Sequence, residues 1–159
     1  MQIKHIILEL VKKHRYNYYI YENPIFENRI KEEKIRADIF KSDFSYLELY
    51  YGDLLPIDTS EALVKSIWDI ILEVFASSLR GSDIKGHLKN DKGLGVIFVD
   101  CDKYAVERLR KRIVEKLYNA DLLKYVINKD NFLNAYIYST NSEDSDSTSG
   151  DSTNSLQKV

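Results

Sequence analysis

The residue types that most often perform chemistry are few in this sequence, and they are widely spaced. The three histidines, His5, His14 and His87, do not stand at a spacing typical of metal ligands. A single cysteine, Cys101, excludes a zinc cluster built from thiolates. No histidine stands where it would be an obvious base for that thiol. These residues therefore predict no metal site, no cofactor and no catalytic set.

A pair of carboxylates, Asp100 and Asp102, directly follows an apolar run at residues 94–99. Two carboxylates at the end of a buried strand can hold magnesium. The sequence Val-Ile-Phe-Val-Asp-Cys-Asp at 96–102 resembles the metal-binding strand of diguanylate cyclases and related palm domains. That resemblance would imply a magnesium-dependent nucleotidyl-transfer enzyme. The alternative, which we favour, is that one acid ends the strand and Asp102 caps the next helix.

Basic side chains gather in two places where they could contact the phosphates of RNA. One group occupies the polar face of a helix expected at residues 104–118. The other lies beside a tyrosine-rich segment at residues 16–21, where basic and aromatic side chains together could hold unpaired bases. Glu107 and Glu115, which interleave the first group, equally suit an ordinary solvated helix. The candidate RNA-binding residues are Arg108, Lys111, Arg112, Lys116, Lys12, Lys13 and Arg15.

Tyrosines provide a second kind of candidate interface. An exposed aromatic patch is typical of a surface that binds another protein, although aromatic residues at strand spacing also occur in the core of a sheet. The alternative of a protein-interaction module that binds no nucleic acid therefore stays open. Its candidate interface residues are Tyr50, Tyr51, Tyr18 and Tyr19.

Composition limits the classes of protein to consider. The chain has 159 residues, 44% of them hydrophobic, which is enough for one domain with a core. The net charge is −2 and, because the C-terminal segment is acidic, the rest of the chain is near neutral, unlike a dedicated basic nucleic-acid binder. No run of about 18 apolar residues predicts a membrane span. One cysteine and no possible internal disulfide indicate an intracellular, reducing compartment.

Hydrophobic periodicity predicts an α+β fold in which the elements follow the order β-α-β-β-α-β. In the first strand, the side chains of Phe44 and Tyr46 point one way and those of Leu47 and Leu49 the other. This order places two helices on one face of a four-stranded antiparallel sheet, as in ferredoxin-like and RRM-like sandwiches. A turn before the third strand gives Gly93 a positive φ. The expected elements are a strand at 44–51, a helix at 61–79, strands at 84–89 and 94–99, a helix at 104–118, and a last strand drawn from 125–127 and 132–138.

Three segments are expected along the chain. Residues 1–41 form an N-terminal extension with a helix, a tyrosine-rich segment and a second helix at 27–39, and they cover the open face of the sheet. Residues 42–138 form the sandwich domain. Residues 139–159 form a disordered acidic tail, because its Ser, Thr, Asn and Asp residues cannot bury enough apolar surface to offset the entropy of ordering.

The order of features between Tyr46 and Leu117 resembles the Pop5/Rpp14 family, the small protein subunits of ribonuclease P and ribonuclease MRP. The resemblance rests on a strand at 46–49, a helix at 62–75, a hairpin, and a strand at 95–99 before a basic helix. It implies a noncatalytic, cofactor-free subunit of an RNA-based ribonuclease that processes tRNA or rRNA precursors. The implied partners are a structured noncoding RNA, a TIM-barrel protein subunit and other subunits of the complex. The implied location is the nucleus, including the nucleolus, in a eukaryote and otherwise the cell interior.

Overall fold

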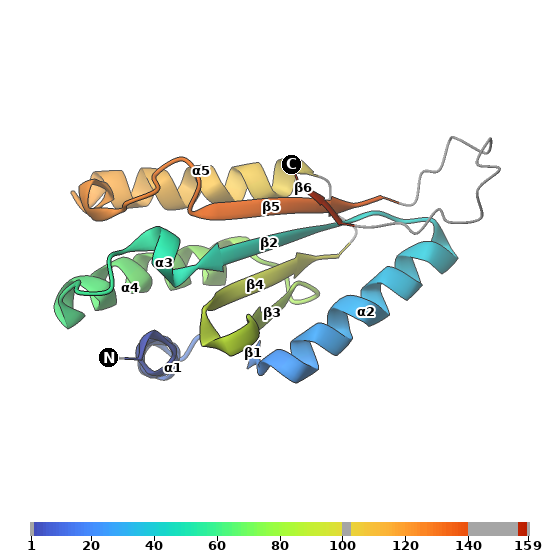
Figure 1. Ribbon diagram of the computed structural model, residues 1–159, viewed down its shortest axis with the longest axis horizontal. Helices are drawn as coiled ribbons and strands as arrows, with labels where there is room; N and C mark the ends of the chain where they lie inside the picture. Colours follow the sequence, from blue (N-terminus) through green and yellow to red (C-terminus); the bar gives the residue numbers. More distant parts are fainter. Residues whose placement is uncertain (1, 100–102, 140–155, 159) are drawn as a thin grey trace.

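A computed structural model describes residues 2–99, 103–139 and 156–158 (Figure 1). The described part of the chain alternates helices with strands. In chain order, the elements are α1 (Ile3–His14), β1 (Ile20–Tyr21), α2 (Asn23–Phe40), β2 (Phe44–Tyr50), α3 (Tyr51–Leu54), α4 (Glu61–Ser78), β3 (Ile84–His87), η1 (Lys89–Asp91), β4 (Gly93–Phe98), α5 (Lys103–Asn119), η2 (Leu123–Tyr125), β5 (Leu133–Tyr138) and β6 (Leu156–Lys158).

The described strands form one mixed sheet in the order β1-β3-β4-β2-β5-β6. Strand β2 lies at its centre and is antiparallel to both β4 and β5, whereas the two-residue β1 runs parallel to β3. From β2 to β5 the chain follows the predicted order of strands and helices. The prediction of a mixed α+β fold is therefore confirmed.

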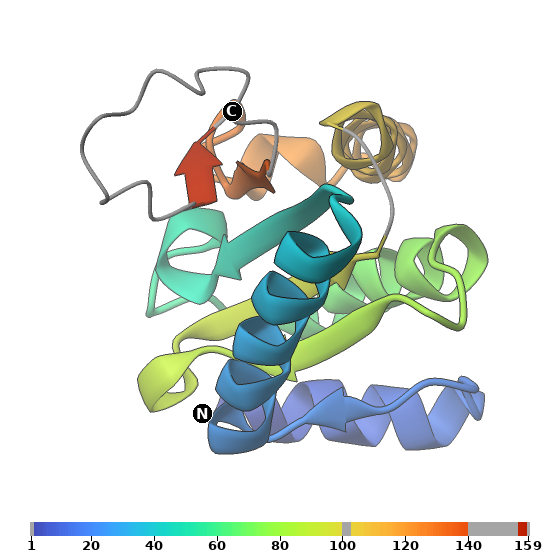
Figure 2. The ribbon, with the colours of Figure 1, turned by 90° about the vertical axis from the view of Figure 1, so that its right-hand side faces the viewer.

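Both faces of the sheet are covered. Helices α1, α4 and α5 pack on one face, where Leu47 and Leu49 of β2 are buried. Helix α2 crosses the opposite face, where Phe44 and Tyr46 of β2 are buried (Figure 2). The alternation along β2 is thus as predicted, and the predicted covering of the open face is carried out by α2.

Helix α4 is buried on most of its circumference because it lies between α1 and α5. Ile67, Trp68 and Ile71 are wholly buried. The helix begins at a side-chain cap, since the Ser60 hydroxyl accepts a hydrogen bond from the backbone N–H of Leu63 at 3.3 Å. It ends at Ser78, within one residue of the predicted position.

Two glycines make room for the aromatic ring that anchors α2. Gly86 and Gly95 are paired across β3 and β4. A Cβ atom at Gly86 would lie 2.1 Å from the Phe26 ring, and one at Gly95 would lie 2.6 Å from it. Phe26 is wholly buried over this pair. Side chains there would hold α2 away from the sheet.

Several local predictions differ from the structure. Positive φ angles occur at Asn90 and Asp91, not at Gly93. Gly93 lies in β4, where a glycine is needed for a different reason: a Cβ atom at this position would lie 2.2 Å from the Leu49 carbonyl oxygen. A strand segment is predicted at 125–127, but residues 123–125 form a 3₁₀ turn. The chain that follows is held by a hydrogen bond from the Ile127 N–H to the Leu54 carbonyl oxygen, not by a neighbouring strand. In the tyrosine-rich segment, only Ile20 and Tyr21 pair as a strand.

The C-terminal segment is described only in part. Residues 140–155, where disorder is predicted, lie outside the described residues. Leu156–Lys158 form β6, which pairs antiparallel with β5. Within the described part of the chain, no helix is both long and apolar enough to cross a membrane.

Candidate functional site

A large hollow lies at the end of the sheet where β2 leads into α3. We call it the end cleft; its volume is about 860 Å³. Its walls come from the start of α1, the segment from Tyr50 to Ile57, and the loop at 90–92 that joins β3 to β4. Three segments far apart in sequence therefore meet around one cavity.

The loop at one wall has an unusual backbone. Asn90 has φ 61° and Asp91 has φ 53°. Left-handed geometry is costly for residues other than glycine, and Asn and Asp tolerate it best. The loop is held to α3 by a backbone hydrogen bond of 2.9 Å from Tyr51 N–H to the Lys92 carbonyl oxygen. Consecutive residues held in this region are typical of functional loops.

A lysine from α1 ties this loop to the N-terminal part of the chain. The Lys4 ammonium donates to the Glu22 carboxylate at 2.7 Å and to the Asp91 carboxylate at 3.2 Å. The hydrogen bond to Glu22 is the largest influence that raises the pKa of Lys4. Lys4 therefore stays protonated and places a positive charge at the cleft wall.

Tyr51 supplies a buried hydroxyl to the cleft. Its ring meets the Trp68 ring edge-on at a centroid distance of 5.5 Å. Its hydroxyl is buried and makes no hydrogen bond to any part of the chain that the structure describes. Burial, followed by the charge of Asp91, raises its pKa, so the hydroxyl keeps its proton. Such an unpaired buried donor is rare in native structures, and here it belongs to a residue that lines a cavity.

A smaller hollow of about 340 Å³ adjoins the end cleft and shares Tyr50, Asn90 and Lys92 with it. In that hollow the Tyr50 hydroxyl donates to the Glu48 carboxylate at 2.8 Å. Burial and this hydrogen bond raise the pKa of Tyr50. Tyr50 thus stands between the two hollows with its hydroxyl already committed to Glu48.

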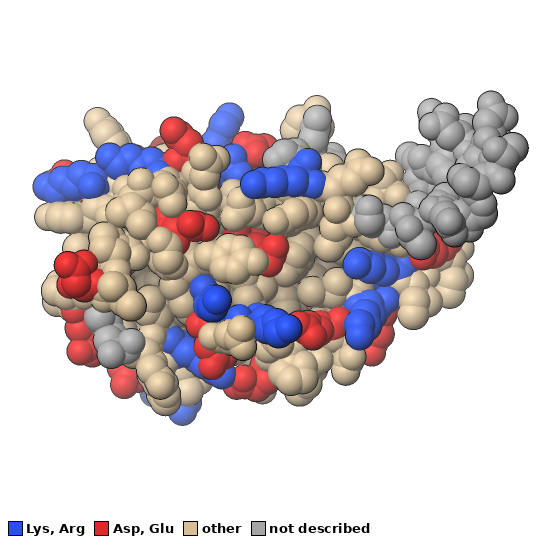
Figure 3. All heavy atoms as spheres, viewed as in Figure 1, with Lys and Arg blue, Asp and Glu red and all other residues tan. Residues whose placement is uncertain are grey.

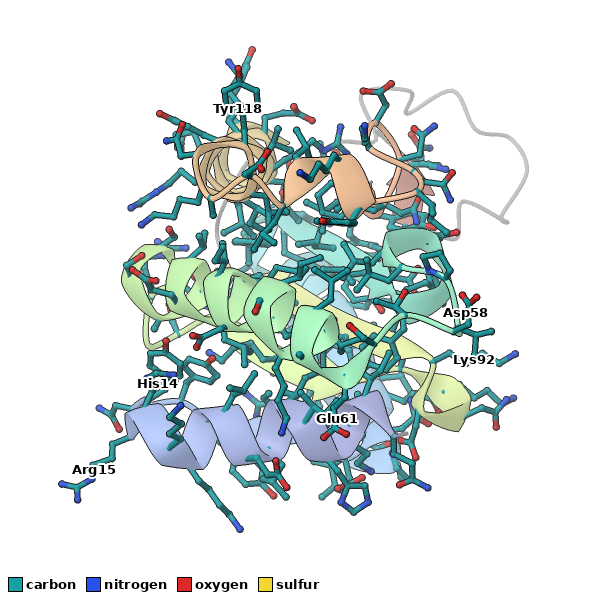
Figure 4. All side chains as sticks on the ribbon, turned by 90° about the vertical axis from the view of Figure 1, so that its left-hand side faces the viewer. His14, Arg15, Asp58, Glu61, Lys92 and Tyr118 are labelled. Atoms are coloured by element: carbon teal, nitrogen blue, oxygen red, sulfur yellow. The ribbon has the colours of Figure 1, made fainter. Side chains whose placement is uncertain are left out.

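Charged side chains lie on the segments that adjoin the cleft, and Lys92 is one of its lining residues. Figure 4 shows Lys92 and Asp58 projecting to the same side from neighbouring loops, with Glu61 at the start of α4. Inside, the Asp53 carboxylate accepts a hydrogen bond from the Asn128 side chain at 3.3 Å. The cleft therefore offers cations and anions over an apolar base that includes Leu55 and Val64.

The predicted basic residues lie away from the end cleft. Arg108, Lys111 and Arg112 are exposed on α5, and Lys116 lies 3.5 Å from Glu73 of α4. Lys and Arg side chains alternate with Asp and Glu over the face seen in Figure 3. The second group, Lys12, Lys13 and Arg15, is exposed at the far end of α1, where Arg15 points into solvent (Figure 4).

The predicted aromatic interface residues are divided between two places. Tyr50 and Tyr51 line the end cleft, and Tyr51 is only 9% exposed, which leaves little of its surface for a protein partner. Tyr18 is partly buried beneath α4, while Tyr19 is 64% exposed. These four tyrosines do not form one patch.

The histidines are also separate. His14 Nε2 lies 2.7 Å from the Asp69 carboxylate, and His5 is exposed on the same helix, α1. His87 is buried on β3, which lies between β1 and β4 in the sheet. The described residues contain no group of three or more acids, histidines and cysteines that could hold a metal ion. Asp100, Cys101 and Asp102 lie outside the described residues.

Sequence reasoning missed most of the end cleft. The Asn90-Asp91 pair carries a signal, because these residue types tolerate left-handed geometry. Lys4 carries none, because it reaches Asp91 across 87 positions of sequence.

No protein-family model matches the sequence, and no curated protein matches it. Solved structures with a similar arrangement include a DGC (diguanylate cyclase) protein from Thermotoga maritima. That protein shares 13% sequence identity and a TM-score of 0.48, over 75% of this chain and 79% of its own. The GGDEF domain of YfiN (TpbB) from Pseudomonas aeruginosa shares 16% identity and a TM-score of 0.49, over 75% of each chain. A shortened form of the same protein, comprising only its GGDEF domain, gives 16% identity and a TM-score of 0.47, over 74% of this chain and 70% of that one.

These neighbours contradict the resemblance to the Pop5/Rpp14 family, because they are GGDEF domains and not ribonuclease P or MRP subunits. The predictions that followed from that resemblance are wrong with it: the RNA-processing role, the RNA and TIM-barrel partners, and the noncatalytic accessory subunit.

Proposed function

We propose that this chain is a nucleotide-binding domain of the palm type and that the end cleft holds a nucleoside triphosphate. The observation that carries the proposal is the buried hydroxyl of Tyr51, a residue that lines the cleft; this hydroxyl has no acceptor among the described residues. A ligand that brings an acceptor oxygen to this hydroxyl would satisfy it.

The size and charge of the cleft suit a nucleotide. A volume of about 860 Å³ lies within the range of small-molecule sites, roughly 300–1,000 Å³. The Lys92 ammonium supplies positive charge for phosphate oxygens, while Lys4, paired with Glu22 and Asp91, offsets the charge of the Asp91 carboxylate at the cleft wall. The apolar residues Leu55, Ile57 and Val64 offer a surface for a base.

Magnesium does not fit the described carboxylates as they stand. Mg²⁺ bound with a nucleotide uses one or two carboxylates together with phosphate oxygens. In this structure Asp91 is paired with Lys4, and Asp53 accepts from Asn128. Binding is therefore assigned to the protein's own cations and hydroxyl, and no step is routed through a metal.

The finer description of the fold is part of the same proposal. A β-α-β-β-α-β core with the strand order β3-β4-β2-β5, all neighbours antiparallel, is the arrangement of a ferredoxin-like sandwich. Palm domains share this order. The N-terminal helices α1 and α2 are additions to that core, and α1 contributes Lys4 to the cleft.

Replacing Tyr51 with Phe tests the proposal, because the change removes only the hydroxyl. Titration calorimetry with each of the four ribonucleoside triphosphates, with and without Mg²⁺, finds the preferred nucleotide for the wild-type chain. We expect Tyr51→Phe to weaken its binding about fivefold, the effect of losing one hydrogen bond of about 1 kcal/mol. Stability without ligand should stay the same or rise, because an unpartnered buried hydroxyl is removed.

Tyr118→Phe is the matched control, since Tyr118 is exposed on α5 away from the cleft (Figure 4). It should bind as the wild type does. Absence of nucleotide binding by the wild-type chain, or equal affinity in Tyr51→Phe, would refute the proposal. Chromatography of the nucleotide after long incubation then shows whether binding is accompanied by nucleotidyl transfer.

A further inference from the structure

A second hollow, separate from the end cleft, lies at the β1 edge of the sheet. We call it the edge hollow; its volume is about 320 Å³. It is lined by the tyrosine-rich segment at 17–21, by Arg29 of α2, by the C-terminal half of α4 and by the chain from 79 to 85. It shares no residue with the end cleft.

Lys85 is a buried cation that lines this hollow. The residue is 6% exposed. Its ammonium donates one long hydrogen bond, 3.4 Å, to the Asp83 carbonyl oxygen and lies 4.9 Å from the centre of the Tyr18 ring. No carboxylate lies within ion-pair distance of it among the residues that the structure describes. The three N–H groups of the ammonium therefore have one long hydrogen bond and one aromatic ring as partners. These contacts do not offset the free-energy cost of burying a charged group. Burial accordingly lowers the pKa of Lys85.

Arg29 is a second incompletely paired cation in the same hollow. Its Nε atom is buried and has no hydrogen-bond partner in the described chain. One of its terminal nitrogens lies 3.4 Å from Glu32 on the same helix. A buried guanidinium N–H without an acceptor is costly. A strand of the sheet, β3, and the helix that crosses one of its faces, α2, thus each bring an incompletely satisfied donor to one cavity.

We propose that the edge hollow is a binding site for a small aromatic phosphate, whose anionic group lies between Lys85 and Arg29. One phosphate group has enough acceptor oxygens to serve both cations at once.

The charges around the hollow support an anion. Asp83 also lines it. The Arg80 backbone N–H donates to one carboxylate oxygen at 2.8 Å, while the other oxygen lies 3.6 Å from the Arg80 guanidinium and is buried without a hydrogen-bond partner in the described chain. Arg29 also forms an ion pair with Glu32, which does not line the hollow. Among the residues that do line it, three cations, Arg29, Arg80 and Lys85, face one carboxylate, Asp83, so the lining carries an excess of positive charge.

The tyrosines support an aromatic group on that anion. The rings of Tyr19 and Tyr21 pack edge to face with a centroid distance of 5.0 Å. Tyr19 is 64% exposed and lines the hollow. A ring face at the mouth of a cationic hollow suits an aromatic ligand that stacks while its phosphate reaches inward.

Titration calorimetry with phenyl phosphate and with inorganic phosphate, at one fixed ionic strength, tests the proposal. We expect saturable binding of one phenyl phosphate per chain, tighter than that of inorganic phosphate. Lys85→Met should weaken it roughly tenfold or more, as expected for a lost charge-assisted hydrogen bond. Arg29→Gln should do the same. Tyr19→Ala should remove the preference for phenyl phosphate over inorganic phosphate.

Two controls remove the same charges elsewhere. Lys13→Met changes an exposed residue of α1, and Arg36→Gln changes a residue of α2 that forms an ion pair with Glu33. Both variants should bind phenyl phosphate as the wild type does. Lys85→Met should fold, because Met fills a similar volume without a buried charge, and circular dichroism checks this. Nucleotide binding in the end cleft should be unchanged by Lys85→Met, so the two sites can fail separately. Wild-type chain that binds neither phosphate, or unchanged affinity in both Lys85→Met and Arg29→Gln, would overturn the proposal.

Discussion

At His87, burial couples folding to pH. The residue is 6% exposed, and its Nδ1 atom has no partner in the described part of the chain. Desolvation, followed by the Lys4 ammonium, lowers its pKa, while the carboxylates of Glu22 and Asp91 partly oppose this. Below the ordinary histidine pKa of about 6.5, the unfolded chain binds a proton that the folded chain does not. We therefore expect the folded state to lose stability as the pH falls from about 7 toward 5.

Urea unfolding at several pH values in this window measures the effect. His87→Leu should lose less stability than the wild type between the two ends of the window, because the proton taken up on unfolding is gone. His5→Leu changes an exposed histidine of α1 and is the control, with a pH dependence like that of the wild type. If the wild type and His87→Leu show the same slope, His87 does not couple folding to pH.

Gly95 is a residue where a single methyl group should be costly. An added Cβ would lie 2.6 Å from the Phe26 ring, which is wholly buried. We expect Gly95→Ala to lower the free energy of unfolding by roughly 1–3 kcal/mol, the usual cost of overpacking. Gly52→Ala is the control, because nothing lies within 4 Å of its Cβ position. Thermal and urea unfolding compare the stability of Gly95→Ala with that of Gly52→Ala. Equal stability of the two variants would mean that α2 can shift without cost.

At the scale of one element, the start of α4 depends on its cap. Ser60 accepts a hydrogen bond from Leu63 N–H. Removing it with Ser60→Ala should cost about 1 kcal/mol of stability, because a backbone donor of the first turn loses its partner. Ser66→Ala is the control within the same helix, since the Ser66 hydroxyl donates to the Ala62 carbonyl of the preceding turn and alanine favours the helix interior. If urea unfolding finds the two variants equally stable, the Ser60 side chain does not stabilise the start of α4.

The elements of the sheet could be predicted where local pattern and final environment agree. Strand β2 alternates apolar residues toward two cores, and α4 and α5 carry apolar residues at helical spacing. The segment at 16–21 has strand composition, yet Tyr16 and Tyr18 stack with each other at 5.5 Å and pack against the core that contains α4. Tertiary packing overrides composition there.

The end cleft is the part of the structure that the sequence predicts least well, because the segments that line it are far apart in sequence and meet only in the folded chain. A turn at 90–93 is predicted, but its left-handed residues are Asn90 and Asp91, since Gly93 is needed inside β4 for its close approach to Leu49. The orphan hydroxyl of Tyr51 depends on its burial beside Trp68. None of these features has a periodicity that sequence alone could reveal.

At the scale of the whole molecule, two cores share one sheet. The larger core lies under α1, α4 and α5, and the smaller one lies under α2. Residues 1–41, which sequence reasoning treats as an extension, supply both α1 and α2. Without them, Phe44, Tyr46 and Tyr138 would lose their covering helix and Ile67 of α4 would lose its neighbour α1.

A fragment of residues 42–138 should therefore fail to fold into a stable monomer. Large exposed apolar surfaces drive association or leave a loosely packed state that binds hydrophobic dyes. Near-ultraviolet circular dichroism, dye binding and gel filtration compare it with a fragment of residues 1–139, which keeps both covering helices. The longer fragment lacks only β6 among the described elements, a three-residue edge strand, and should keep a cooperative transition. A native-like, monomeric 42–138 fragment would instead mean that the sheet and two helices form an autonomous domain and that α1 and α2 are docked onto it.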